Sequence, residues 1–160
     1  MEMSEEYNNI DRFNLVAIAL FAKLHATFPV PEDISPMSFG HACVPVDAGS
    51  DTAFEMGADA VHVLTWLEEE GFIRVGKKSL PDRLHGVRLT MKAMSVLGQL
   101  PSSLSSAKEK RPLIARMREV LANATAKAAT DAASSLISEV FSLGLRVAIT
   151  SQHNNSNVST

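Results

Sequence analysis

Apolar residues recur every three or four positions in the N-terminal part of the chain. This spacing predicts a helix with one buried stripe from Asn9 to Phe28. Pro29 and Pro31 end it, because proline lacks the amide hydrogen that would continue the helix and restricts the residue before it. The prolines and glycines of residues 30–50 leave room only for a short strand or a single helical turn, near Ser38 to Cys43. The buried stripe is expected to contain Ile10, Phe13, Val16, Ala17, Leu20, Leu24 and Phe28.

A second helical pattern runs from Asp51 to Glu70. Asp51 is expected to cap its first turn, and Gly71 can adopt the left-handed conformation that closes many helices. Gly57 leaves open whether this segment is one helix or two, because glycine costs roughly 1 kcal/mol inside a helix relative to alanine. If there are two, the later helix begins at Ala58. The side that we expect to face the core consists of Phe54, Ala58, Val61, Leu64 and Leu67.

Two strands and a further helix are predicted next. Apolar residues alternate with arginine in residues 72–75 and again in residues 87–89, as in half-buried strands, and a polar loop separates the two runs. Thr90 is expected to cap a helix that runs from Met91 to Leu100. The proline and serines of residues 101–106 indicate a linker. This division predicts three parts: a domain at residues 1–104, a helical extension at 105–150 and a disordered tail at 151–160.

The extension carries two apolar stripes at helical spacing, which predict one long helix or a helix pair. Pro112 suits a first helical position, and the small residues between Ala122 and Ser135 allow two helices to approach closely. Exposed apolar surface costs about 25 cal/mol per Å², so we expect a second copy to cover the stripes in a homodimer or higher homo-oligomer. Packing onto the first helix of the same chain is the alternative. The stripes are Leu113, Met117, Val120, Leu121, Ala124 and Ala128, and then Leu136, Ile137, Val140, Phe141 and Gly144.

The string from Trp66 to Arg74, WLEEEGFIR, and the string from Val87 to Ala93, VRLTMKA, resemble the winged helix-turn-helix domains of bacteria. In that family a helix with such an end leads into a wing hairpin, and a strand ending in Leu-Thr leads into the last helix. The resemblance covers roughly half the chain. It implies a mainly α (α+β) fold: a winged-helix domain with a two-stranded wing hairpin, followed by a long C-terminal helix or helix pair. It also implies DNA reading or protein interaction as the function.

Charge is distributed unevenly along this part of the chain. The whole chain has 15 Lys and Arg against 18 Asp and Glu, for a net charge of −3, which excludes a globally basic nucleic-acid-binding protein. The helix from Asp51 to Glu70 contains six acidic residues and no Lys or Arg, so its outer face would repel phosphates. The hairpin between Gly71 and Lys92 has six Lys and Arg against one Asp. We expect five of them to contact the phosphates of double-stranded DNA: Arg74, Lys77, Lys78, Arg83 and Arg88.

Two functions follow from this division. The first is a DNA-binding transcriptional regulator, dimeric through its C-terminal helix. The second is a protein-protein interaction module that docks a partner on the acidic helix, self-associates through the C-terminal helix and binds no DNA; here the charges of the hairpin reflect only its exposure to solvent. The side chains assigned to protein contacts are His62, Trp66 and Glu69 on the acidic helix and Leu136, Val140 and Phe141 on the C-terminal helix.

The sequence offers little chemistry beyond binding. It contains no phosphate-binding glycine loop and no nucleophile elbow, and His41 and Cys43 are too few for a closed zinc site. We expect a non-enzymatic protein without cofactor or metal, with Cys43 partly buried. A single cysteine permits no intrachain disulfide and favours the reducing cytoplasm, as does the absence of an export signal in the acidic N-terminal residues. Glu139 and Arg146 interrupt the most apolar segment, which argues against a membrane span.

Overall fold

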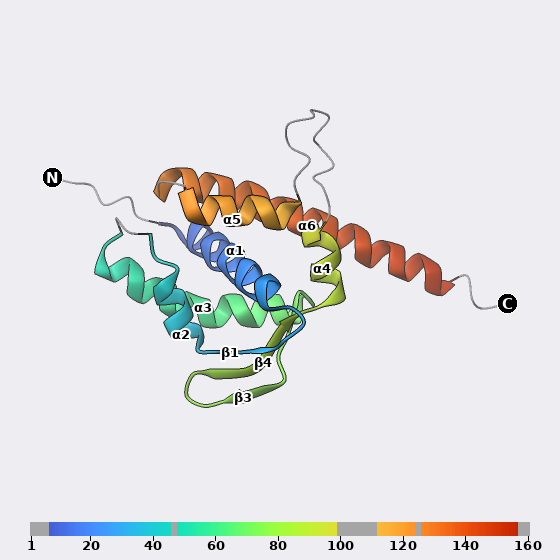
Figure 1. The fold of residues 1–160 in the computed structure, drawn as a ribbon, viewed down its shortest axis with the longest axis horizontal. Coiled ribbons are helices and arrows are strands. Elements are labelled where there is room, and N and C mark those ends of the chain that lie inside the picture. Colours follow the sequence, from blue (N-terminus) through green and yellow to red (C-terminus); the bar gives the residue numbers. More distant parts are fainter. Residues whose placement is uncertain (1–6, 46–47, 99–111, 124–125, 157–160) are drawn as a thin grey trace.

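The computed structural model describes residues 7–45, 48–98, 112–123 and 126–156. These residues form six helices and one small antiparallel sheet of four strands (Figure 1), which confirms the mainly α, α+β class. In chain order the elements are α1 (Asn9–Thr27), β1 (Glu32–Ile34), α2 (Pro36–Ala42), α3 (Ser50–Glu69), β2 (Ile73–Arg74), β3 (Lys77–Ser79), β4 (Arg83–Leu89), α4 (Met91–Gly98), α5 (Leu113–Asn123) and α6 (Ala126–Ser156).

Helix α1 is the central element, and its predicted bounds are confirmed to within one residue. It lies between α3 on one side and α5 and α6 on the other (Figure 1). Asn8 and Asp11 form a reciprocal capping box at its start, with Asp11 N donating to Asn8 Oδ1 over 2.9 Å. The prediction of a single buried stripe is wrong, because the four consecutive residues from Leu15 to Ile18 are all buried. A helix covered on several sides buries most of its circumference.

Helix α3 is continuous, so Gly57 does not separate two helices. Its N-cap is Gly49, and Asp51 lies in the first turn, which corrects the predicted cap. Gly57 and Gly40 instead allow α2 and α3 to pack closely. A Cβ on Gly57 would lie 2.5 Å from the His41 ring, and a Cβ on Gly40 would overlap the backbone of α3.

The side of α3 that faces the core differs from the predicted one. Phe54 is 65% exposed, Val61 is 38% exposed and Ala58 is also exposed. The helix carries two apolar sides, and the side predicted to face the core is largely exposed to solvent. Only Leu64 and Leu67 of the predicted set belong to the buried side. The buried side consists of Met56, Ala60, Val63, Leu64 and Leu67.

Strand β4 is the centre of the sheet and pairs with β1, β2 and β3, all antiparallel. The two predicted strands are present, and β3 was not predicted. Residues 30–50 contain both a short strand, β1, and a short helix, α2, where only one or the other was expected. Gly71 has the expected positive φ of 78° after α3. Thr90 is also confirmed as a cap, because Ala93 N donates to Thr90 Oγ1 over 3.2 Å, and the same hydroxyl donates to the Gly71 carbonyl over 2.6 Å.

The C-terminal helices pack against their own chain. Helix α6 contacts α1, α4 and α5, and Leu136 and Val140 are buried there, with Phe141 half-buried. The same-chain alternative therefore describes these three side chains, in place of the preferred contact with a second copy. Residues 128–149 are long and apolar enough to cross a membrane, but about a third of that stretch is buried inside the protein.

Two further predictions concern the ends of this region. The predicted linker at residues 101–106 lies outside the described residues. Of the predicted disordered tail, residues 151–156 form the last turns of α6, and residues 157–160 lie outside the described part.

Candidate nucleic-acid interface

The hairpin places most of its cations on one face of the sheet. Residues paired directly across two strands project to the same face. Arg74 of β2 pairs with Arg88 of β4, and on β3 Lys77 pairs with His85 and Ser79 with Arg83. Each strand pair thus contributes basic side chains at matched positions.

Burial of the neighbouring residues shows which face this is. Ile73 and Leu89 are buried in the core, so the alternation of a strand turns Arg74 and Arg88 away from the helices. Leu84 pairs with the buried Ile34 and so faces the core, which turns its neighbours Arg83 and His85 outward in the same way. The register of β4 against β1 shifts within this stretch, where Gly86 has a φ of 67°. At this β-bulge, β4 has one residue more than β1. The extra residue shifts the alternation, so that Arg83, His85 and Arg88 all project to the same face.

We call the exposed set Arg74, Lys77, Arg83 and Arg88 the basic face. All four side chains are exposed, and within the described part of the chain none of them forms an ion pair. Arg74 and Arg88 stand directly opposite each other, an arrangement of like charges that destabilises a sheet unless an anion lies between them. The face is therefore suited to bind several negative charges.

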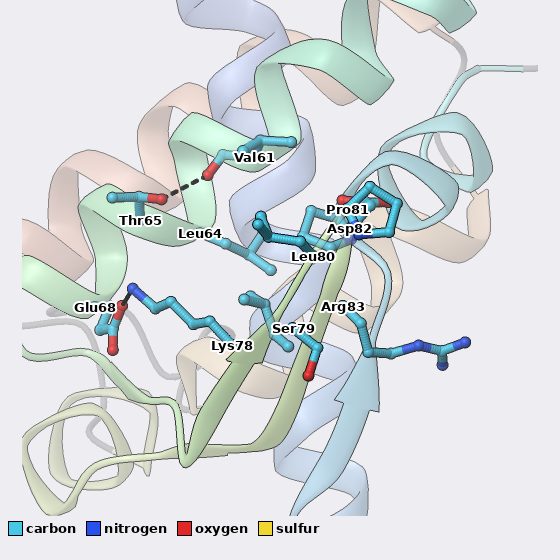
Figure 2. Close-up of a pocket in the computed structure, with 12 residues that line it drawn as sticks. Val61, Leu64, Thr65, Glu68, Lys78, Ser79, Leu80, Pro81, Asp82 and Arg83 are labelled. Carbon is cyan, nitrogen blue, oxygen red and sulfur yellow. Dashed lines mark hydrogen bonds and ion pairs between the residues drawn. The ribbon is translucent and has the colours of Figure 1, made fainter.

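Lys78, the fifth predicted contact, belongs to the opposite side. Its Nζ atom lies 2.6 Å from Glu68 Oε2 of α3 (Figure 2). This ion pair joins the hairpin to α3 and leaves Lys78 separate from the basic face. The structure thus brings together four of the five predicted side chains.

A polar chain that the sequence did not reveal crosses the same outer face. His85 Nδ1 lies 3.0 Å from Asp33 Oδ2, and His85 Nε2 lies 3.1 Å from Ser79 Oγ. The hydrogen bond with His85, and then that from the Gly86 amide, lower the pKa of Asp33. These contacts tie β1, β4 and β3 together. Asp33 belongs to a segment without strand periodicity, so no local pattern pointed to it.

These three residue types in this order also occur in serine hydrolases, where the histidine activates the hydroxyl. Such chemistry needs a site that excludes water and presents donors to a developing oxyanion. Figure 2 shows the Ser79 oxygen pointing away from α3 and from the hollow beside it. Asp33 and His85 are themselves open to solvent, with side chains 56% and 37% exposed. In this arrangement the three hydrogen-bonded side chains hold neighbouring strands of the sheet together.

The tip of the hairpin is held against the start of α2. Asp82 Oδ2 accepts hydrogen bonds from Ser35 Oγ over 2.5 Å and from Met37 N over 3.2 Å. Between this tip and α3 lies a hollow of about 290 Å³ (Figure 2). Leu80 stands at its edge and is 97% exposed. The hairpin thus has a fixed position relative to α3.

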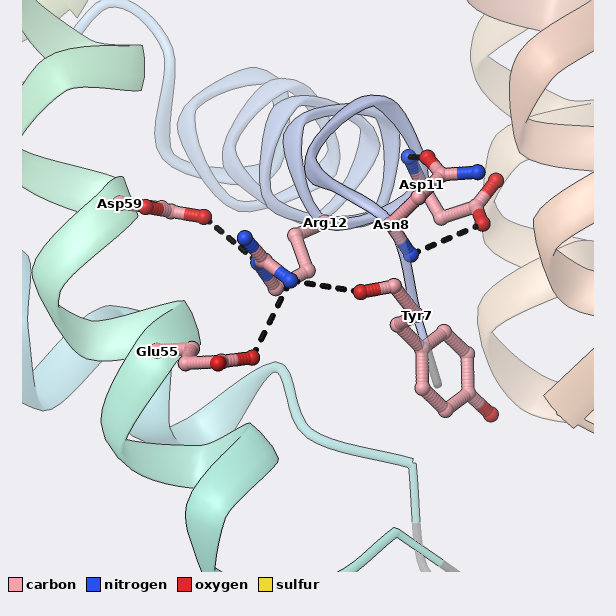
Figure 3. Close-up of polar contacts among 6 residues, drawn as sticks. All are labelled: Tyr7, Asn8, Asp11, Arg12, Glu55 and Asp59. Carbon is pink, nitrogen blue, oxygen red and sulfur yellow. Dashed lines mark hydrogen bonds and ion pairs between the residues drawn. The ribbon is translucent and has the colours of Figure 1, made fainter. Parts of the chain in front are cut away.

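The acidic side of α3 is partly neutralised within the chain. Arg12 of α1 donates from Nε to Asp59 over 2.6 Å, and its Nη1 lies 3.1 Å from Glu55 (Figure 3). The same Nη1 donates to the Tyr7 carbonyl over 2.6 Å. With Glu68 paired to Lys78, three of the six acidic groups of this region have cationic partners. The sequence pattern overstated the negative charge that this helix presents.

The three side chains of α3 assigned to protein contacts, His62, Trp66 and Glu69, are exposed as predicted. Trp66 also packs edge-on against Phe13, with ring centroids 5.4 Å apart, and lies 5.1 Å from the Phe141 ring. The predicted residues of α3 and α6 therefore meet, but inside one chain. His62 and Trp66 line an open hollow of about 310 Å³ between α1 and α3.

Cys43 donates a hydrogen bond to the Phe39 carbonyl over 3.2 Å, and burial raises the pKa of its thiol to about 12. Its predicted partial burial is confirmed. Within the described residues, His, Cys, Asp and Glu form no group of three that could hold a metal. Comparisons with protein-family models, curated proteins and solved structures gave no match. Function must therefore be argued from the surface itself.

Proposed function

We propose that this chain is a non-enzymatic winged-helix protein that binds double-stranded DNA through phosphate contacts made by the basic face. One observation carries the proposal: four exposed cations, free of ion pairs among the described residues, share one side of a rigidly anchored sheet. A role as a cytoplasmic transcriptional regulator belongs to the same proposal, on the strength of the family resemblance.

The order of elements supports the winged-helix part of the proposal. The string from Trp66 to Arg74 spans the end of α3 and β2, and the string from Val87 to Ala93 spans the end of β4 and the start of α4. Both lie where the resemblance requires them, on either side of a hairpin. The contact expected from this hairpin is between its exposed Arg and Lys side chains and phosphate oxygens of the sugar-phosphate backbone, which position a protein on the duplex and carry no base-sequence information.

The experiment is a titration of a short duplex, followed by fluorescence anisotropy, over a range of salt concentrations. Replacing Arg74 and Arg88 together by Gln should remove about two units from the slope of log affinity against log salt, and weaken binding roughly 50-fold at 0.1 M salt. Lys77→Gln should remove about one unit.

Lys78→Gln is the matched control, because Lys78 is adjacent in sequence but is paired with Glu68 on the other side of the sheet. It should leave the slope unchanged. Absence of duplex binding at low salt, or equal losses for Lys77→Gln and Lys78→Gln, would contradict the proposal.

A second candidate is a protein-interaction module that binds no DNA. It is favoured by α3, which has no Lys or Arg and exposes both apolar and acidic side chains. In that case the duplex titration shows no binding, whereas substitutions on α3 remove association with a protein.

A further inference from the structure

A stripe of small and apolar side chains runs along the solvent side of α3. Phe54, Ala58, Val61 and Thr65 follow one another at intervals of four, three and four, so they lie in line on one face. All four are exposed, and Phe54 is 65% exposed despite its size. We call these residues the α3 stripe. An apolar surface of this kind is costly in water and marks a contact site when it is continuous.

The hairpin extends this surface. Val61 and Thr65 line the hollow of about 290 Å³ together with Leu80 and Pro81 of the tip. Figure 2 shows Val61 and Leu80 on its two opposite sides. Leu80 is 97% exposed, although a hairpin tip is normally polar. The chain therefore offers an apolar knob beside an apolar recess.

Opposite charges border the two parts. On the flank of α3, Asp51 and Glu69 are exposed and form no ion pair among the described residues. On the hairpin, Arg83 is exposed beside the tip. The 2.6 Å pair of Lys78 with Glu68 shows that the side chains of these two elements are compatible at contact distance. An acidic helix and a basic hairpin are complementary to each other, and both belong to the same chain.

We propose that two copies of this chain associate about a two-fold axis through this surface, with Leu80 of each copy seated on the α3 stripe of the other. A two-fold interface requires a surface that is complementary to itself. Here Leu80 and Arg83 of one copy match the apolar hollow and the acidic side of α3 of the other copy. The contact lies on the α3 side of the hairpin and includes Arg83 beside the tip. It leaves Arg74, Lys77 and Arg88 of the basic face free, so it does not depend on DNA binding.

The test is analytical ultracentrifugation of the full chain over a concentration series. The wild-type chain should form a dimer. Leu80→Asp and Phe54→Asp should each raise the dissociation constant of this dimer at least tenfold, because a symmetric contact would bury one new carboxylate from each copy. Leu145→Asp is the matched control: it places the same charge on an exposed leucine of α6, 66% exposed, and should leave the dimer intact.

A second measurement places the two contacts directly. Ala58→Cys and Leu80→Cys are made in separate chains and mixed under mild oxidation, so that a mixed disulfide can form only between copies. We expect this species in excess over either symmetric disulfide. Cys43 stays unreactive because burial raises the pKa of its thiol.

Three outcomes would overturn the proposal. They are a monomeric wild type at every concentration, a dimer that survives both Leu80→Asp and Phe54→Asp, and a dimer that is lost in Leu145→Asp. The last would point to α6 as the interface. Circular dichroism of each variant verifies that the fold is retained. Duplex binding by the same variants is measured separately, so failure of the dimer and failure of the DNA proposal are distinguishable.

Discussion

The fold strongly alters the chemistry of the Cys43 thiol, because burial raises its pKa. A pKa raised to about 12 leaves on the order of 1,000-fold fewer thiolates at pH 8 than an open cysteine has. Alkylation by iodoacetamide at pH 8 should therefore be slower than in the urea-unfolded chain by at least about 100-fold. Mass spectrometry of the time course measures both rates.

The sign of the pH effect provides the control. Because the thiolate is the reactive form, the native rate should still rise about tenfold per pH unit between pH 8 and pH 10, whereas the rate of an open cysteine levels off above a pH of about 9. Equal labelling rates for native and unfolded chains would show that Cys43 is not buried as described.

Residues that act within one turn of their neighbours were predictable, and those that act across the fold were not. The positive φ of Gly71 and the cap at Thr90 depend only on local backbone needs. Arg12 binds Asp59 from a different helix, and His85 meets Asp33 from a different strand. No local sequence pattern indicates which distant side chains will pair.

Packing of α2 against α3 depends on glycine at two positions. Gly40→Ala places a methyl group where the backbone of α3 already lies, so we expect a loss of about 1–3 kcal/mol in the free energy of unfolding. Urea denaturation monitored by Trp66 fluorescence gives this value. A loss below the error of the method would show that α2 can move away from α3 at no cost.

Gly98→Ala is the matched control, since a Cβ at that end of α4 would meet nothing within 4 Å. It should be neutral or stabilise by up to about 1 kcal/mol, the difference in helix propensity. The comparison separates crowding at Gly40 from the general effect of replacing glycine in a helix.

Among the secondary-structure elements, the long helices were predictable because their apolar spacing extends over many turns. The position of strand β1 was not predictable, since three residues after two prolines carry no periodicity and pair only with distant β4. The orientation of α3 also failed, because two apolar sides satisfy the same spacing. Which side is buried depends on where α1 lies.

The molecule as a whole includes its C-terminal helices in the core. Leu136 is buried where α6 packs on α1, so Leu136→Ala should cost about 2–5 kcal/mol in the free energy of unfolding. Leu145→Ala, at a leucine 66% exposed on the same helix, should change it by less than about 0.5 kcal/mol. Urea denaturation curves of both variants provide the measurement.

Cooperativity is part of the same prediction. The wild-type chain should unfold in a single transition by circular dichroism and by Trp66 fluorescence, because Trp66 contacts Phe141 of α6. Two separate transitions, or equal effects of the two substitutions, would show that the extension is independent of residues 1–98.

The basic face could be predicted only in part, because its composition depends on how the strands of the whole sheet pair. The sequence locates a cluster of cations in the hairpin, but strand register decides that Lys77 faces outward and Lys78 faces α3. The burial of Leu136 and Val140 within their own chain could not be predicted for a similar reason, since an apolar stripe does not specify which surface covers it.

The contact between α6 and Phe72 has a consequence for how such a chain can change over time. A Cβ on Gly144 would lie 2.8 Å from the Phe72 ring, and Lys92 Nζ lies 4.5 Å from the centroid of that ring. Positions 72 and 144 therefore share one volume: a larger residue at one requires a smaller residue at the other. Descendants and ancestors of this sequence should show paired substitutions there, a coupling that links the hairpin to the last helix.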